Sequence, residues 1–319
     1  MNMEILVIGA GVSGLTTGIT LLRTGHTVRI WAKALPPETT SNVAAAVWYP
    51  YKAYPADRVA AWGAEAYRVF MRLADDPATG VIRSELLDLL REPAPDPDWH
   101  AAVDGFHHAR ADELPKGFVD AHVFAAPVID TSVYLDYLMH TFQTEGGRIE
   151  RRDVRDMAEA LADCPVVVNC AGLGARELVG DGEFHPLRGQ VVRVRRAGSR
   201  RVLLDSGVAG EVTYIVPRIS DMILGGTDDE GNESTEPDPV VTRDILRRCA
   251  RLDPTLAHLT ESDILSVAVG IRPVRSTVRL EAAPAGVGRW LIHNYGHGGA
   301  GVTLSWGCAS EVARLIEGL

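Results

Sequence analysis

Short apolar runs alternate with stretches of helical periodicity along the chain. Residues 5–8 form an apolar run, residues 15–23 carry apolar side chains at helical spacing, and residues 27–31 form a second apolar run. This order predicts a buried parallel strand, a helix and a second strand. Apolar runs at 165–169 and 290–294 predict two further strands.

The first strand and helix are joined by Gly-x-Gly-x-x-Gly at Gly9, Gly11 and Gly14. The first glycine permits a tight turn, the second lets a pyrophosphate approach the backbone, and the third lets the helix pack close to the strand. In this strand-turn-helix context the motif predicts a dinucleotide at the helix N-terminus, and therefore redox chemistry. The carboxylate that usually binds the ribose is missing after the second strand, because Lys33 stands there and no acidic residue follows before Glu38. We expect backbone groups or Lys33 to make that contact.

Dinucleotide-type segments at both ends and near residue 165 leave the middle of the chain for a second domain. We therefore expect an α/β fold, with a Rossmann-like domain and an interleaved α+β substrate domain on a mixed or antiparallel sheet. The expected dinucleotide-binding segments are 1–50, 135–188 and 272–319, and the expected substrate-domain segments are 51–134 and 189–271. The pattern also predicts helices at 57–74, 131–145, 238–252 and 303–316.

Composition narrows the function classes. The formal net charge of −10 argues against nucleic-acid binding, and no apolar run is long enough to span a bilayer. Because the chain leads directly into its first strand, we expect no signal peptide. The four cysteines lack the spacing of metal ligands, so we expect a protein of the reducing cytoplasm without a bound metal.

Six motifs, in the same order along almost the whole chain, resemble those of the D-amino-acid oxidase family. They are Thr-Thr-Ser-Asn-Val-Ala-Ala at 39–45, Val-Asn-Cys-Ala-Gly at 168–172, Leu-Arg-Gly-Gln at 187–190, Tyr-Ile-Val-Pro at 214–217, Gly-Ile-Arg-Pro-Val-Arg at 270–275 and Asn-Tyr-Gly-His-Gly-Gly-Ala-Gly at 294–301. This resemblance implies FAD as the cofactor, with a D-amino acid and oxygen as substrates.

The resemblance also implies the cofactor contacts. The pyrophosphate would lie against the first glycine turn and the hydroxyl-bearing segment 39–41, the adenine against Val154, and the flavin ring against 298–303. N–H groups at the start of the last helix would stabilise negative charge on the reduced ring. The residues expected to bind FAD are Gly9, Ala10, Gly11, Val12, Ser13, Gly14, Lys33, Thr39, Thr40, Ser41, Ala44, Ala45, Val154, Ala171, Gly172, Gly298, Gly299, Ala300, Gly301, Val302 and Thr303.

Three residues would carry the catalytic roles that the resemblance implies. Arg272 would bind the substrate carboxylate through a planar two-pronged contact, Tyr214 would add its phenol, and the Gly299 carbonyl would accept a hydrogen bond from the amine. Hydride transfer from Cα to flavin N5 would need no protein base. The imino acid would hydrolyse to a 2-oxo acid and ammonia, and oxygen would become hydrogen peroxide. The residues expected to line the substrate pocket are Trp48, Tyr49 and Val216.

Several alternatives stay open. Arg275 and Arg279 are rivals for the carboxylate, and His297 is expected to make a structural hydrogen bond rather than act as an acid or base. Asp228 stands where the aspartate-oxidising branch carries an arginine, so neutral or basic D-amino acids are expected. A D-aspartate oxidase is the alternative if Arg218 reaches the site.

A glycine- or sarcosine-type amine oxidase would share the fold and the FAD, and it is a further alternative. The segment before Tyr214, residues 205–211, is shorter than the tyrosine-bearing lid of the eukaryotic enzymes, which predicts an open site. The oligomeric state does not follow from the sequence, and a homodimer is an open alternative.

Overall fold

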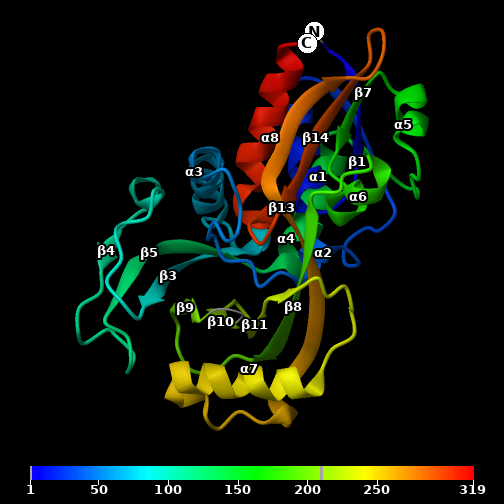
Figure 1. The fold of residues 1–319 in the computed structure, drawn as a ribbon. Coiled ribbons are helices and arrows are strands. Elements are labelled where there is room, and N and C mark those ends of the chain that lie inside the picture. Colours follow the sequence, from blue (N-terminus) through cyan, green and yellow to red (C-terminus); the bar gives the residue numbers. More distant parts are fainter. Residues whose placement is uncertain (1, 209–210) are drawn as a thin grey trace.

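The computed structural model describes residues 2–208 and 211–319. Within them, fourteen strands form one mixed sheet that runs through two lobes, in the order β4-β5-β3-β9-β10-β11-β8-β13-β14-β7-β1-β2-β6 with β12 beside β8. The upper lobe in Figure 1 holds both chain ends, and the lower lobe ends in the helix α7. The predicted α/β class with a mixed sheet is confirmed.

The upper lobe is a parallel sheet with helices on both faces. Its strands are β1 Glu4–Ile8, β2 Thr27–Ala32, β6 Arg148–Arg151, β7 Val166–Asn169 and β14 Trp290–His297. Ile5 and Val7 of β1 pack on one face, and Leu6 and Ile8 on the other. Because both faces are covered, β1 is apolar throughout rather than alternating.

Helices of the upper lobe pack mainly on one side of this sheet. The helices there are α1 Val12–Arg23, α3 Ala56–Leu73, α4 Thr131–Thr144 and α8 Gly301–Glu317. The opposite face carries α5 Met157–Asp163 and the short α6 Ala175–Leu178, while the one-turn α2 Thr40–Val43 contacts α4 and β13. Asp130 caps α4 by accepting a hydrogen bond from the Ser132 amide (3.2 Å), as Ser/Thr/Asp residues do at helix starts.

The last helix begins earlier than the periodicity predicts. The Leu304 amide donates to the Ala300 carbonyl (2.9 Å), so α8 starts at Gly301 instead of residue 303. Glycine weakens the helical pattern in the sequence, because it has no side chain to contribute to the period. The earlier start places Val302 and Thr303 in the first turn.

The lower lobe is mainly antiparallel. Its strands are β3 Val81–Leu90, β4 His107–His108, β5 Asp120–Ile129, β8 Phe184–Arg195, β9 Val202–Val208, β10 Glu211–Pro217, β11 Asp221–Thr227 and β12 Asp229–Glu230. The helix α7 Pro239–Leu252 covers one face, and its Ile245, Cys249 and Leu252 pack on Val192 and Leu224. Short 3-10 turns lie at Pro77–Thr79, His100–Ala102, Gly172–Gly174, Pro254–Leu256 and Glu261–Asp263.

The long strand β13, Ile264–Pro284, passes from one lobe to the other. It pairs with β8 from Ile264 to Arg275 and with β14 from Val274 to Pro284. Arg272 therefore lies where the two lobes meet. The exact segment boundaries of the two expected domains stay a prediction, and residues 209 and 210 of the 205–211 segment lie outside the described residues.

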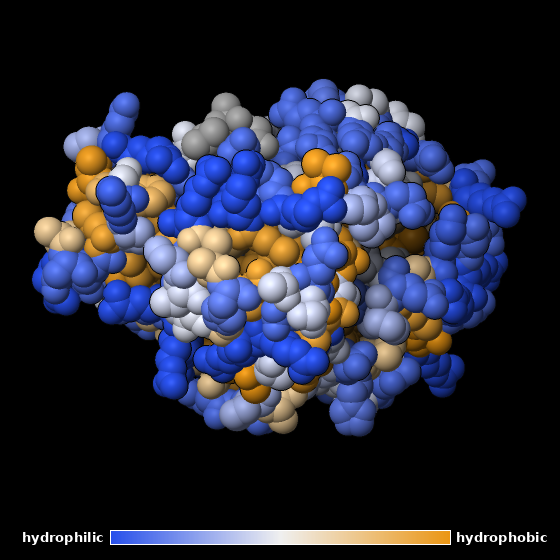
Figure 2. Space-filling model, turned by 90° about the horizontal axis from the view of Figure 1, so that it is seen from below, coloured by the Kyte–Doolittle hydropathy of each residue, from blue (hydrophilic) through white to orange (hydrophobic). Residues whose placement is uncertain are grey.

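The surface agrees with the composition. Figure 2 shows a largely hydrophilic face interrupted by separate apolar patches. No helix among the described residues is long and apolar enough to cross a membrane.

Candidate active site

The backbone of the turn between β1 and α1 is not covered by side chains at its glycines. Gly9 has a φ of +108°, and a Cβ there would lie 2.5 Å from the Cys170 carbonyl oxygen. A Cβ at Gly14 would lie 1.9 Å from the Gly9 carbonyl oxygen, which is the close helix-strand packing that the motif predicts. The Val12 amide, in the first turn of α1, donates to the Ser41 hydroxyl (3.0 Å). The N-terminal amides of α1 and the segment 39–41 therefore form one cradle with the polarity that a phosphate needs.

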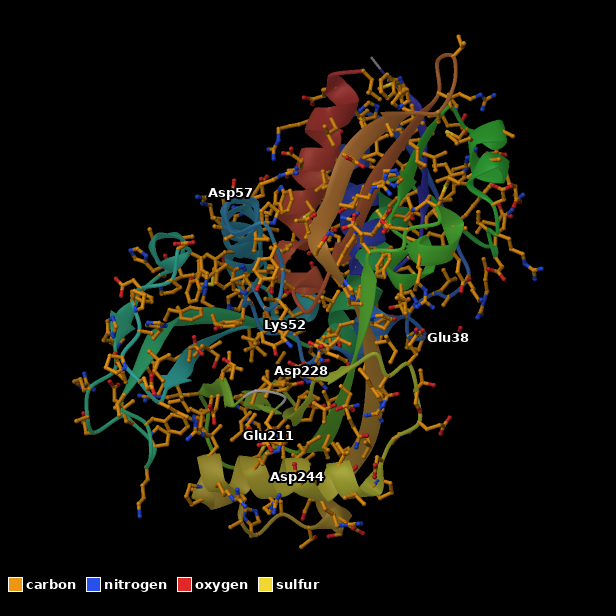
Figure 3. The ribbon with its side chains drawn as sticks, in the orientation of Figure 1. Glu38, Lys52, Asp57, Glu211, Asp228 and Asp244 are labelled. Carbon is orange, nitrogen blue, oxygen red and sulfur yellow. The ribbon has the colours of Figure 1, made fainter. Side chains whose placement is uncertain are left out.

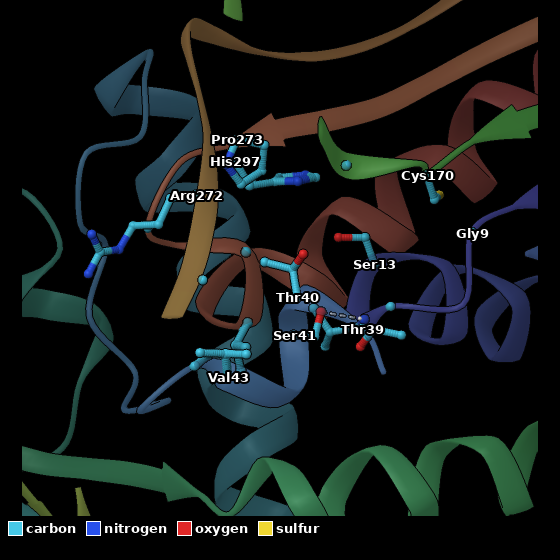
Figure 4. A pocket seen from close by; sticks show the side chains of 18 of the residues that line it. Gly9, Ser13, Thr39, Thr40, Ser41, Val43, Cys170, Arg272, Pro273 and His297 are labelled. Atoms are coloured by element: carbon cyan, nitrogen blue, oxygen red, sulfur yellow. Dashed lines mark hydrogen bonds between the residues drawn. The ribbon is translucent and has the colours of Figure 1, made fainter. Parts of the chain in front are cut away.

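A single cavity of about 910 Å³ extends from this cradle to Arg272. Figure 4 shows Gly9, Ser13 and Ser41 at one end and Arg272 at the other. Most of the expected cofactor residues line it, namely Gly9, Ala10, Gly11, Val12, Ser13, Lys33, Thr39, Thr40, Ser41, Ala44, Ala45, Val154, Ala171, Gly172, Gly298, Gly299, Gly301, Val302 and Thr303. Gly14 and Ala300 do not line it. They support the wall instead, Gly14 by packing on Gly9 and Ala300 as the N-cap of α8.

The glycine-rich turn before α8 packs on the segment 49–52. Gly298 has a φ of +56°, and a Cβ there would lie 2.1 Å from the Lys52 carbonyl oxygen. A Cβ at Gly299 would lie 2.7 Å from Cδ1 of Tyr51. The Thr303 hydroxyl donates to the Tyr49 carbonyl (3.0 Å). Side chains at Gly298 or Gly299 would thus displace the segment 49–52, which lines the cavity.

His297 lies in the cavity wall but is held by its neighbours. Its Nε2 is 3.0 Å from Oδ1 of Asn294, whose Nδ2 donates to the Thr17 hydroxyl (3.0 Å). Burial lowers the pKa of His297 to about 4, because the charged imidazolium loses its solvation. The ring is therefore neutral at pH 7, and the structural hydrogen bond expected for it has a partner.

Arg272 is anchored on one side. Its Nη1 donates to the Thr227 carbonyl (2.9 Å) and to Oδ1 of Asp228 (2.9 Å). Gly189 of β8 lies under the guanidinium, and a Cβ there would lie 2.5 Å from Nη2. Both of these hydrogen bonds start from Nη1. Its remaining N–H groups can therefore bind an oxyanion in the cavity.

Tyr214 lies at the same end of the cavity. Its ring packs on Gly225 and Gly226, where a Cβ would lie 2.1 and 2.8 Å from the tyrosine ring or hydroxyl. Burial raises the pKa of Tyr214, and the Arg272 guanidinium opposes that shift only in part. Tyr214 is thus a neutral phenol at pH 7 and can donate a hydrogen bond beside the guanidinium.

Asp228 joins Arg272 to the segment 49–52. Lys52 pairs with its Oδ2 (2.8 Å), and the Tyr51 hydroxyl donates to the same oxygen. Figure 3 shows Lys52 and Asp228 next to each other where the lobes meet. Lys52 adopts a left-handed backbone with a φ of 49°, a strained conformation that local context must hold. Lys52 is not among the residues expected from the sequence, because no local signal indicates a partner so far along the chain.

The rival arginines have other partners. Nε of Arg275 bonds Asp181 (3.0 Å), and Nη1 of Arg279 bonds the Tyr295 hydroxyl (2.8 Å). Arg218 is buried, and its Nε bonds Asp221 (2.6 Å). In the described structure these three side chains do not line the cavity, so among the four candidate arginines Arg272 is the one that reaches it.

Trp48, which the sequence predicts in the substrate pocket, lies in the core instead. Its Nε1 donates to the Gly63 carbonyl (3.0 Å), and its ring packs edge-on against Tyr67 in the core. The Trp48 amide donates to Pro127 of β5, so the segment is extended there. Side chains then alternate in direction, and Val47 and Tyr49 line the cavity while Trp48 points away. Val216, the third expected pocket residue, lines the cavity.

The end of the cavity near the phosphate cradle is polar. Lys33 lines it, and its amino group lies 3.8 Å from Asp153. Glu38 also lines it and pairs with Arg151. Figure 3 places Glu38 well away from Asp228. The cavity therefore has charged side chains near the cradle, and at the other end the Arg272 guanidinium lies among Tyr214 and apolar side chains.

These features fit a flavin dinucleotide. A volume of about 910 Å³ is at the upper end of the range for cofactor sites. The glycine turn and the N-terminus of α1 suit a pyrophosphate, and the Gly298–Gly299 turn leaves room for a planar ring against the start of α8.

Comparisons with known proteins agree with this geometry. The family model described as FAD dependent oxidoreductase matches residues 4–315. A D-amino-acid oxidase of Rubrobacter xylanophilus is 49% identical over 97% of this chain and 94% of the relative. A D-amino-acid oxidase of Streptomyces coelicolor is 44% identical over 98% of this chain and 97% of the relative. A D-amino-acid oxidase of Dictyostelium discoideum is 41% identical over 99% of this chain and 92% of the relative.

Solved structures show the same fold. The glycine oxidase from Geobacillus kaustophilus superposes with a TM-score of 0.78 at 18% identity and covers 99% of this chain and 95% of that one. At this identity the match concerns the fold alone. The family match and the high identity of the relatives over nearly the full length show that the chain belongs to the FAD-dependent oxidoreductase family.

Proposed function

We propose that the protein is a D-amino-acid oxidase, which converts a D-amino acid and oxygen into a 2-oxo acid, ammonia and hydrogen peroxide. The observation that carries the proposal is the guanidinium of Arg272, which is anchored by Asp228 and Thr227 and open toward the end of the flavin cavity. The full-length relatives named D-amino-acid oxidase support it.

When bound, FAD would supply the electron acceptor for oxidation of the substrate, with oxygen as the final oxidant. This chain's residues supply binding and orientation. Gly9, Gly11 and the start of α1 would hold the pyrophosphate, and the amides at the start of α8 would stabilise negative charge on the reduced flavin. Positioning and a fixed electrostatic environment then provide the catalysis.

The substrate is held through its carboxylate. The free edge of the Arg272 guanidinium binds it in two places, and the neutral phenol of Tyr214 donates a further hydrogen bond. Gly299 lines the cavity, and its carbonyl would accept a hydrogen bond from the substrate amine and so help to orient the substrate. His297 is neutral and bonded to Asn294, so we assign no base to the Cα hydrogen.

The substrate side chain occupies an apolar part of the cavity. Beside Tyr214, the lining side chains include Val191, Val202, Leu204, Val212 and Val216. An acidic side chain would lose its solvation there without a partner cation, since Arg218 is committed to Asp221. A basic side chain would find Asp228 already paired with Lys52. We therefore place neutral apolar D-amino acids first, then basic ones, and D-aspartate last.

Two further assignments belong to the proposal. Glu38 is the carboxylate nearest in sequence to the expected ribose position, and it lines the cavity, so we assign the ribose hydroxyls to Glu38 with Lys33 beside it. The four cysteines are free and buried, which supports function in the reducing cytoplasm.

A homodimer stays a prediction, and light scattering would measure the oligomeric state.

A flavin spectrum and a peroxide assay test the proposal together. Purified protein should be yellow, and it should release peroxide with D-alanine, D-valine or D-methionine but not with their L-enantiomers. Glycine and sarcosine serve as the controls for the alternative amine oxidase. Faster turnover of glycine or sarcosine than of any D-amino acid in the panel would contradict the proposal, and so would activity with L-amino acids.

A further inference from the structure

A cluster of histidines and carboxylates lies on the β3-β5-β4 part of the lower lobe, outside the flavin cavity. His108 of β4 is paired in register with His122 of β5, and Asp96 of the preceding loop lies beside them. One ligand atom from each of these three residues lies within 4.8 Å of the other two. The ring centroids of the two histidines are 5.3 Å apart.

Each histidine also has a carboxylate behind it. Nδ1 of His108 is 2.5 Å from Oδ2 of Asp120, and Nδ1 of His122 is 3.8 Å from Oδ2 of Asp88. Nε2 of His108 is 2.8 Å from Oδ1 of Asp96. Histidines that bind metals usually direct the second ring nitrogen to a carboxylate, as Nδ1 of His108 does toward Asp120. The 3.8 Å separation from Asp88 is too long for a hydrogen bond, so it leaves Nδ1 of His122 without one.

His122 distinguishes this cluster from an ordinary surface ion pair. A protonated His108 between Asp96 and Asp120 would account for His108 alone. His122 is 4% exposed, and within the described residues neither of its ring nitrogens has a hydrogen-bond partner. A buried polar side chain without a partner is uncommon, and here one of its ring nitrogens lies within 4.8 Å of a potential ligand atom of Asp96 and of His108.

We propose that Asp96, His108 and His122 bind a divalent transition-metal ion of the zinc type. Two imidazoles and one carboxylate suit such an ion, whereas calcium and magnesium prefer oxygen ligands alone. Water would complete the coordination, because Asp96 and His108 are exposed. The expectation that the chain binds no metal rests on the spacing of its cysteines, and none of these three ligands is a cysteine.

The ion would fasten a loop to the sheet. Asp96 belongs to residues 91–98, which have no helix or strand and carry a proline at every second position from 93 to 97. Both histidines are in strands, so a shared ion would connect the loop to β4 and β5. Metal binding should therefore stabilise the folded protein, by an amount that rises with the logarithm of the free metal concentration above the dissociation constant.

Calorimetric titration of the chelator-treated holoprotein with zinc chloride tests the proposal. We expect one Zn²⁺ per chain with a dissociation constant in the micromolar range or tighter, and a higher melting temperature with Zn²⁺. Asp96→Asn and His108→Gln should each weaken binding at least tenfold. Both positions are exposed, so the variants should fold, and far-UV circular dichroism checks this.

His107→Gln is the matched control. His107 precedes His108 on the same strand, but its Nδ1 is 2.8 Å from the Gly105 carbonyl oxygen, and it is not part of the cluster. This variant should bind zinc like the parent protein. Equal zinc affinity in the parent, Asp96→Asn and His108→Gln would overturn the proposal, as would no binding at 100 µM zinc.

Discussion

Replacing Arg272 with alanine removes the proposed carboxylate clamp. The substrate would lose two charge-assisted hydrogen bonds of about 1.5–3 kcal/mol each, or about 3–6 kcal/mol in all. Such a loss lowers kcat/KM by about 10²- to 10⁴-fold. The protein should remain folded, because Asp228 keeps Lys52 (2.8 Å) and the Tyr51 hydroxyl as partners.

Arg272→Lys separates charge from geometry. Lysine keeps the positive charge but offers a point contact in place of the planar fork. Because the ammonium replaces only one of the two hydrogen bonds to the carboxylate, binding should weaken by about 1.5–3 kcal/mol, and kcat/KM should fall by about 10- to 100-fold. The lysine variant should therefore lie between the parent protein and the alanine variant.

Steady-state peroxide assays with D-alanine measure these values, and the flavin absorbance at equal protein concentration shows whether FAD is retained. Arg275→Lys is the matched control, because Arg275 is on the same strand but pairs with Asp181 (3.0 Å). Its kcat/KM should change by less than about threefold. The reasoning is refuted if Arg272→Ala keeps kcat/KM within fivefold of the parent, or if Arg275→Lys loses more activity than Arg272→Lys.

Three further changes follow from the structure. In Gly189→Ala, a Cβ 2.5 Å from Nη2 displaces Arg272, so KM for D-alanine should rise at least tenfold at unchanged flavin content. In Gly14→Ala, a Cβ 1.9 Å from the Gly9 carbonyl forces α1 away from β1, so flavin content and melting temperature should both fall. The third concerns acid stability, since His297 has a pKa of about 4 in the fold and about 6.5 unfolded. The unfolded chain binds this proton first as pH falls, so the free energy of unfolding should drop by about 2 kcal/mol between pH 7.5 and 5, and His297→Gln should remove that part of the loss in urea titrations.

Each of these has a contrary outcome. A Gly189→Ala variant with parental KM would mean that the guanidinium tolerates a methyl group beneath it. A Gly14→Ala variant with full flavin content would separate the close packing from cofactor binding. Parallel pH profiles of parent and His297→Gln would show that the buried imidazole does not contribute to acid sensitivity.

The sequence by itself determined the features that depend on neighbouring residues. The run 5–8, the glycines at 9, 11 and 14 and the following helical period specify β1, its turn and α1, because each is set by local backbone freedom and by burial on both strand faces. The motifs that resemble the D-amino-acid oxidase family likewise indicated Arg272 and Tyr214, and the structure brings both to one end of the cavity.

Tertiary structure decided what surrounds those residues. Tyr51 and Asp228 are 177 positions apart, and only the path of β13 between the lobes brings the segment 49–52 to Arg272. Trp48 is aromatic like its neighbour Tyr49, yet the pairing with β5 turns it into the core. Local sequence patterns indicate which faces of a strand or helix are apolar and which turns are allowed. Which residues pack against each face depends on how strands that are distant in the sequence pair.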